Sequence, residues 1–171
     1  PTSSFHRCVP SWNQGLCYPP DPPTVEEIIA VMRAGGDGLD GVRLRGVIIL
    51  LWRAGLRISE VLALNETDLD CDRGALLVRH GRAISARQVG MDRRAWSQLK
   101  PWLELRATFP VGRLFCVLRG LTRGRACAPA GIREQLQQAA TAAGARARFA
   151  PHTPRHPRSR WQRRAGRPVP A

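Results

Sequence analysis

The stretch Leu51-Trp-Arg-Ala-Gly-Leu-Arg-Ile-Ser-Glu-Val-Leu-Ala-Leu64 decides how this 171-residue chain is organised. Its apolar beginning stops at a glycine, a residue that readily ends helices. The pattern predicts a buried helix over residues 40–54 and a short helix over residues 60–64. At the junction, the carboxylate of Glu60 can fix the rotamer of Arg57. A guanidinium held in this way can bind the non-bridging oxygens of a phosphate.

Helical and strand patterns on both sides of this stretch favour a mainly α fold with a small antiparallel β-sheet, an α+β class. Thr24 and Glu27 have the spacing of a capping box, and the helix that they begin stops at Gly35-Gly36. A turn around Gly81 separates two short strand-like segments. Further along the chain, the sequence predicts helices over residues 92–106 and 128–143, and strands over residues 76–78, 87–91 and 114–117.

The charge balance points to a nucleic-acid partner. The chain holds 27 basic and 13 acidic residues, a net charge of +14, and Lys100 is the only lysine. The last 26 residues contain eight arginines and no acidic residue. Arginine binds phosphate bidentately, which favours double-stranded DNA as a partner. A GC-rich genome is the alternative source of the Arg/Lys ratio, but it does not explain the net charge.

The cysteines and the apolar segments exclude other classes of protein. Five cysteines are scattered along the chain without a CxxC pair, so we expect reduced thiols and no metal site. The longest apolar run, Val47–Trp52, is too short to cross a bilayer. These features predict a cytoplasmic protein without membrane contact.

Four motifs follow one another along the chain: Gly55-Leu-Arg-x-Ser-Glu60, His80-Gly81-Arg82 with Arg87-x-Val89, Leu114-Phe115 with the helix over residues 128–143, and Pro151-His152-Thr153-Pro154-Arg155-His156. In this order they resemble the catalytic domain of the tyrosine recombinases, the phage integrase family. The second motif resembles the family's hairpin, Gly-Lys-Gly-x-Lys-x-Arg-x-Val-Pro-Leu, and the last resembles Pro-His-x-Leu-Arg-His. The resemblance covers residues 22–156, with a lead-in over residues 1–21 and an Arg/Pro-rich, disordered tail over residues 157–171.

The resemblance implies a mechanism and a set of site residues. In the family a tyrosine attacks the scissile DNA phosphate, two arginines stabilise the transition state, a histidine assists proton transfer, and a hairpin lysine protonates the leaving oxygen. No metal or other cofactor is implied. The implied catalytic residues are Arg57, Arg82, His152 and Arg155, and the implied DNA-binding residues are Arg57, Glu60, Arg82, Arg87, Arg155 and His156.

Two departures from the family pattern put cleavage in doubt. Arg82 stands where the family has lysine, and arginine releases its proton too reluctantly to act as an efficient acid. The only tyrosine, Tyr18, precedes the resembling segment, and Pro154 replaces a helical leucine. We therefore expect a chain truncated before the nucleophilic tyrosine. It would be a DNA-binding remnant of a site-specific recombinase from a mobile element, unable to cleave DNA by itself.

Two alternatives stay open at this point. The chain could be a non-catalytic partner that associates with a full-length recombinase and modulates it. It could also be the non-functional product of a pseudogene, with apolar surface left uncovered. A helix-turn-helix regulator is disfavoured, because no pair of predicted helices has the short turn and the polar recognition face of that class.

Overall fold

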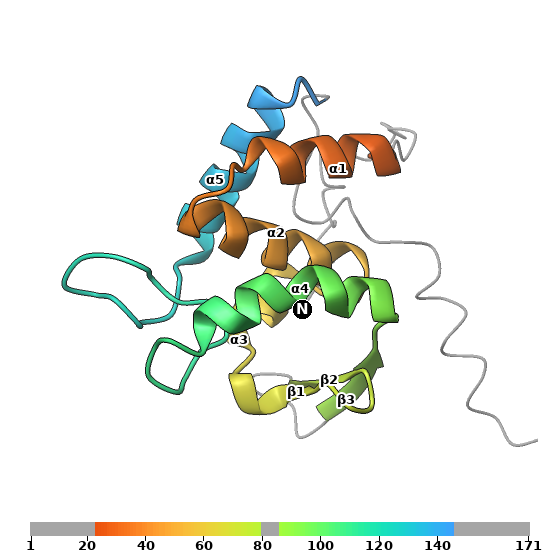
Figure 1. The fold of residues 1–171 in the computed structure, drawn as a ribbon, viewed down its shortest axis with the longest axis vertical. Helices are drawn as coiled ribbons and strands as arrows, with labels where there is room; N and C mark the ends of the chain where they lie inside the picture. The colour runs from red at the N-terminus through yellow and green to blue at the C-terminus, as the bar shows by residue number, and fades with distance from the viewer. Residues whose placement is uncertain (1–22, 80–85, 146–171) are drawn as a thin grey trace, which may run out of the picture.

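The computed structural model describes residues 23–79 and 86–145 of the chain (Figure 1). The predicted lead-in, the turn around Gly81 and the predicted tail lie outside these residues. Four predicted site residues also lie outside them, namely Arg82, His152, Arg155 and His156.

The described residues form a mainly helical fold with one small antiparallel sheet, which confirms the predicted fold class. The helices are α1 (Val25–Ala34), α2 (Leu39–Trp52), α3 (Ile58–Ala63), α4 (Arg93–Arg106) and α5 (Pro129–Ala142), and a 3-10 turn η1 spans Glu66–Asp68. The strands are β1 (Leu69–Asp70), β2 (Ala75–Arg79) and β3 (Ala86–Gly90).

Helix α2 forms the centre of the core because it is apolar on nearly every side. Its residues from Gly46 to Trp52 are all buried. Helix α4 packs against α2 (Figure 1), and it brings Trp102 into a stacked contact with Phe115 at 5.5 Å between ring centroids. The ring of Trp102 also lies close to Gly46, where α2 has no side chain. Helices α1 and α5 pack against each other and cover another side of α2.

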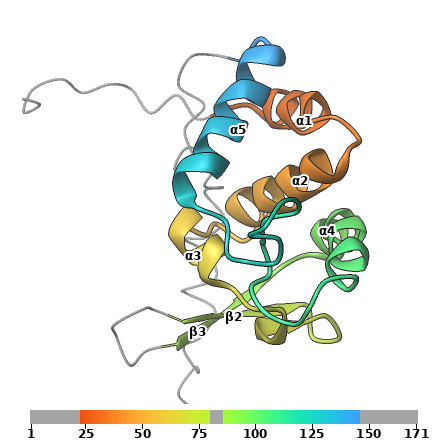
Figure 2. The same ribbon diagram turned by 90° about the vertical axis from the view of Figure 1, so that its left-hand side faces the viewer.

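The sheet lies at one end of the helical body, next to α3 (Figure 2). Its strand order is β1-β2-β3, and all pairs are antiparallel. Val78 is paired with Arg87 across β2 and β3. Because paired residues point to the same face, Arg87 lies on the side of the sheet on which Val78 is buried. Leu77 is on the opposite, outer face.

Two local predictions were wrong. Residues 114–117 form no strand: Cys116 makes an isolated bridge to Ala126, and Arg113 just before them makes one to Asn65. Their apolar pattern reflects burial in a connecting segment. The short helix begins at Ile58 rather than at residue 60, because the Glu60 carboxylate accepts a hydrogen bond from the backbone amide of Arg57. Within the described part of the chain, the structure contains no helix that is long and apolar enough to cross a membrane.

A pair of glycine substitutions tests the packing of α2. A Cβ atom at Gly41 would collide with the carbonyl oxygens of Gly35 and Gly36, which are backbone atoms and cannot easily move. We expect Gly41→Ala to lower the free energy of unfolding by about 1–3 kcal/mol, measured by urea denaturation.

Gly131 in the first turn of α5 is the matched control. A Cβ atom there meets open space, so Gly131→Ala should raise the free energy of unfolding by about 0.5–1 kcal/mol through a less flexible unfolded chain. Equal stability of the wild type and Gly41→Ala would contradict the close approach of α1 and α2.

Candidate functional site

The junction between α2 and α3 presents Arg57 to the solvent. Gly55 has a φ of 65°, a left-handed conformation that turns the chain after α2. Leu56 and Ile58, on either side of Arg57, are buried and anchor the junction in the core. Arg57 is itself exposed. The backbone of this arginine is therefore fixed by its neighbours, while its guanidinium faces outward.

Glu60 connects this junction to the sheet. One of its oxygens, Oε2, accepts a hydrogen bond from the Arg57 amide at 2.8 Å. The guanidinium of Arg87 on β3 donates to both oxygens, with Nη1–Oε1 at 2.9 Å and Nη2–Oε2 at 3.0 Å. The side chain of Glu60 is only 10% exposed, whereas that of Arg87 is 41% exposed. A single carboxylate thus binds the backbone of Arg57 and the side chain of Arg87, which come from segments far apart in the sequence.

The electrostatics of this cluster keep Glu60 ionised. Partial burial by itself raises the pKa of Glu60. The hydrogen bonds from Arg87 and from the Arg57 amide, together with the charges of both arginines, outweigh burial, so the pKa lies below its ordinary value. We refer to Arg57, Glu60 and Arg87 as the arginine cluster. Its carboxylate is largely buried, and its two arginines are more exposed to solvent.

A second carboxylate anchors the neighbouring strand. Asp68 is buried, and its Oδ1 accepts a hydrogen bond at 2.9 Å from Nε of Arg79 at the end of β2. Its Oδ2 accepts one at 2.9 Å from the amide of Asn65. Both strands that lead into residues 80–85 are therefore tied to carboxylates near α3. The sequence analysis did not predict a role for Asp68, although Asn65 and Asp68 lie three residues apart and have the spacing of a cap.

The other end of α3 is held by a buried arginine that sequence reasoning also missed. Arg106 at the end of α4 is 1% exposed; it donates to the carbonyl oxygens of Arg113 at 2.8 Å and Pro110 at 2.9 Å. Its Nη1 lies 3.3 Å from Oε1 of Glu66. Arg113 in turn donates to the carbonyl oxygen of Ala63, the last residue of α3. These contacts fix α3 against the loop that follows α4.

Three of the predicted site residues therefore come together: Arg57, Glu60 and Arg87. Glu60 binds the backbone amide of Arg57 and the side chain of Arg87. No group of three or more His, Cys, Asp and Glu side chains in residues 23–79 and 86–145 is placed to hold a metal ion.

Comparison with known proteins identifies the family. The family model described as "Phage integrase family" matches residues 21–171. This chain belongs to the phage integrase family. Tyrosine recombinase XerC of Chlamydia trachomatis is 33% identical over 140 residues, which cover 80% of this chain and 44% of that protein. Tyrosine recombinase XerC of Alcanivorax borkumensis is 28% identical, over 77% of this chain and 43% of its own length. The chain thus spans less than half the length of these two relatives.

Solved structures of the family share the fold. A crystal structure of XerA recombinase superposes with a TM-score of 0.69 at 20% identity, covering 98% of this chain and 54% of that one. The XerH site-specific recombinase, bound to a palindromic difH substrate in a post-cleavage complex, gives a TM-score of 0.63 at 25% identity. That match covers 80% of this chain and 40% of XerH. The predicted recombinase resemblance is therefore confirmed.

The substitution Glu60→Gln tests the bridge between α3 and β3. It removes a charge that holds the Arg57 amide and Arg87, so we expect a loss of about 1–3 kcal/mol in the free energy of unfolding at pH 7. Because folding lowers the pKa of Glu60, its stabilising effect is complete above the unfolded value near 4.5 and is lost as the pH falls through the folded value. The difference between wild type and variant should shrink below pH 4.5.

The matched control is Glu104→Gln on α4. Glu104 is exposed and lies 3.7 Å from Lys100 in an i,i+4 pair, so its loss should change stability by less than about 0.5 kcal/mol. A Glu60→Gln effect as small as this, or one that does not depend on pH between 3 and 7, would contradict the bridge.

Proposed function

We propose that this chain is the phosphate-binding part of a site-specific DNA recombinase and that it binds duplex DNA through the arginine cluster. The observation that carries the proposal is the bidentate hold of Glu60 on Arg87 beside the exposed Arg57, within a family fold. Arginines that are positioned before the ligand arrives lose little conformational freedom when they bind a phosphate. They can also stabilise the charge that develops on a phosphate under attack.

Catalytic roles for Arg57, Arg82, His152 and Arg155, and DNA contacts from Glu60, Arg87 and His156, remain part of this proposal. We further propose that the 171-residue chain binds DNA without cleaving it. Its one tyrosine, Tyr18, precedes the segment that matches the family, so no tyrosine inside that segment can act as the nucleophile. Arg82 can neutralise phosphate charge but is a poor proton donor.

Binding should depend on salt and on Arg57. Each phosphate neutralised by an arginine releases counterions, so the logarithm of the affinity should fall linearly with the logarithm of the salt concentration. We expect Arg57→Ala to weaken binding of a 30-base-pair duplex about tenfold at low salt and to reduce that slope by about 1. Fluorescence anisotropy over a salt series measures both quantities.

Arg33→Ala on α1 is the control for net charge, because Arg33 is an exposed arginine outside the arginine cluster. It should leave the affinity within about twofold, which corresponds to less than 0.5 kcal/mol. A folded wild-type chain without affinity for DNA at low salt, or equal effects of the two substitutions, would contradict the proposal.

A suicide substrate separates binding from cleavage. A nicked duplex that traps the covalent intermediate of tyrosine recombinases should be shifted by this chain in a native gel but should give no adduct on a denaturing gel. The physical reason is the lack of a tyrosine among residues 21–171. A covalent protein–DNA adduct would show that another group attacks the phosphate and would refute the proposed inactivity.

Association with a full-length recombinase, origin from a mobile element and a cytoplasmic location stay predictions from the sequence. Co-purification of the chain with an intact recombinase tests the first of them. A strictly monomeric chain in that mixture would leave DNA binding as its sole proposed interaction.

A further inference from the structure

A second basic surface belongs to the segment that connects α4 to α5, away from the arginine cluster. Residues 117–125 form a hairpin-like loop, here called the basic loop, which is closed by two backbone hydrogen bonds of 2.8 Å. Val117 N–H donates to the carbonyl oxygen of Arg125, and Gly124 N–H donates to that of Val117. Gly120 and Gly124 have positive φ angles of 77° and 84°, which allow the tight reversal. The loop projects from the helical body in Figure 1.

The base of the basic loop is firmly held. Phe115 and Cys116 directly before it are fully buried, and Nη1 of the buried Arg43 donates to the carbonyl oxygen of Cys116 at 3.1 Å. Within the loop, the guanidinium of Arg123 lies over the ring of Phe109, 4.6 Å from its centroid. The core therefore presents this loop in a defined position, and a partner would meet a surface that is already formed.

The charged side chains of the basic loop are all positive. Arg119, Arg123 and Arg125 are exposed, and the sequence has no acidic residue between Glu104 and Glu134. Among the residues that the structure describes, these three arginines have one ion pair, in which Asp40 of α2 lies 3.5 Å from Arg119. At the tip between the arginines, Leu121 is fully exposed. A single exposed leucine is ordinary, but one surrounded by three arginines combines an apolar tip with phosphate-binding groups.

We propose that the basic loop binds the minor groove of duplex DNA, with Leu121 directed into the groove and the arginines on the flanking phosphates. This inference rests on the proposed function and extends it to a second contact. The minor groove is about 6 Å wide, so it admits a narrow loop tip rather than a helix. Its negative potential attracts arginine, and leucine is among the side chains that proteins insert between base steps there.

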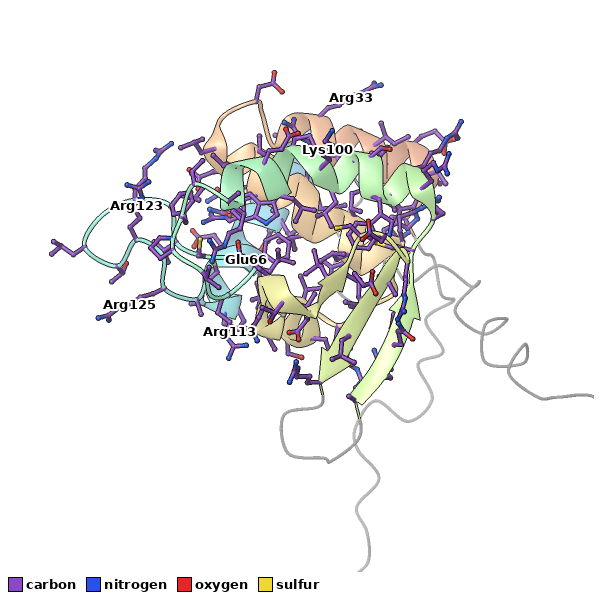
Figure 3. All side chains as sticks on the ribbon, turned by 60° about the horizontal axis from the view of Figure 1, so that its bottom comes forward. Arg33, Glu66, Lys100, Arg113, Arg123 and Arg125 are labelled. Atoms are coloured by element: carbon purple, nitrogen blue, oxygen red, sulfur yellow. The ribbon has the colours of Figure 1, made fainter. Side chains whose placement is uncertain are left out.

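The separation of the two surfaces makes the inference testable. Figure 3 shows Arg123 and Arg125 at the opposite edge of the molecule from the β2–β3 hairpin, and Figure 1 also separates this loop from the sheet. One apolar residue gives too little burial for stable attachment to a membrane, which disfavours a lipid surface as the partner. An acidic protein surface would satisfy the arginines but would give Leu121 no groove, so it becomes an outcome of the test.

The first experiment measures the salt dependence of binding to a 30-base-pair duplex with a central A·T tract. The triple variant Arg119→Ala, Arg123→Ala, Arg125→Ala should lower the slope of log affinity against log salt by about 2–3, close to 0.9 for each phosphate. The triple Arg→Lys variant keeps the charges and should keep the slope. Thermal unfolding followed by circular dichroism checks that both variants are folded.

The second experiment identifies the groove. Netropsin, which fills the minor groove of A·T tracts, should weaken binding of the wild type at least fivefold and that of Leu121→Ala less than twofold. An undiminished slope in the triple alanine variant, equal effects of netropsin on wild type and Leu121→Ala, or tighter binding of a polyglutamate peptide than of the duplex would overturn the inference.

Arg57→Ala, measured in parallel, separates the two proposals. If Arg57→Ala weakens binding while the triple alanine variant behaves as wild type, the inference about the basic loop fails and the proposed function stands. If the loop substitutions alone weaken binding, the basic loop is supported and the role of the arginine cluster fails. A wild-type chain that does not bind the duplex overturns both.

Discussion

The ionised carboxylate of Glu60 is the interaction on which the arrangement of this site depends. It accepts from the Arg57 amide and from both terminal nitrogens of Arg87, so it joins the start of α3 to β3. The contact with Arg87 joins two charged groups, of which only the carboxylate is largely buried, so it is stronger than a pair that is fully exposed to water. One partly buried carboxylate therefore fixes the backbone at Arg57 and the side chain of Arg87 relative to each other.

The arginine cluster keeps this geometry only because the rest of the fold holds α3 in place. The buried helix α2 leads directly into the junction, and Leu56 and Ile58 anchor it on either side of Arg57. At the far end of α3, Arg113 donates to the Ala63 carbonyl, while Arg106 holds the backbone of the same loop. Core packing and buried polar contacts thus fix both ends of a six-residue helix that would be unstable alone.

The comparison with XerA shows how little sequence identity this framework requires, since 20% identity accompanies a TM-score of 0.69. Apolar side chains of similar volume can replace one another in a core without changing the arrangement of its helices. Polar groups at the junction are less replaceable, because each must meet a partner of opposite charge in a fixed geometry. For this reason the motif Gly-Leu-Arg-x-Ser-Glu told more about the family than the apolar segments around it.

Local patterns determined most of the elements and one contact of the arginine cluster. The capping box at Thr24, the cap at Asp92 and the apolar length of α2 act within a few residues, so sequence predicts them well. Glu60 beside Arg57 is equally local. Only the tertiary structure decided that Glu60 would hold Arg87, that Asp68 would hold Arg79, and that residues 114–117 would be a buried connection instead of a strand. These contacts depend on which segments meet after the chain has folded. Contacts between residues that are distant in the sequence produce no periodic pattern in the sequence.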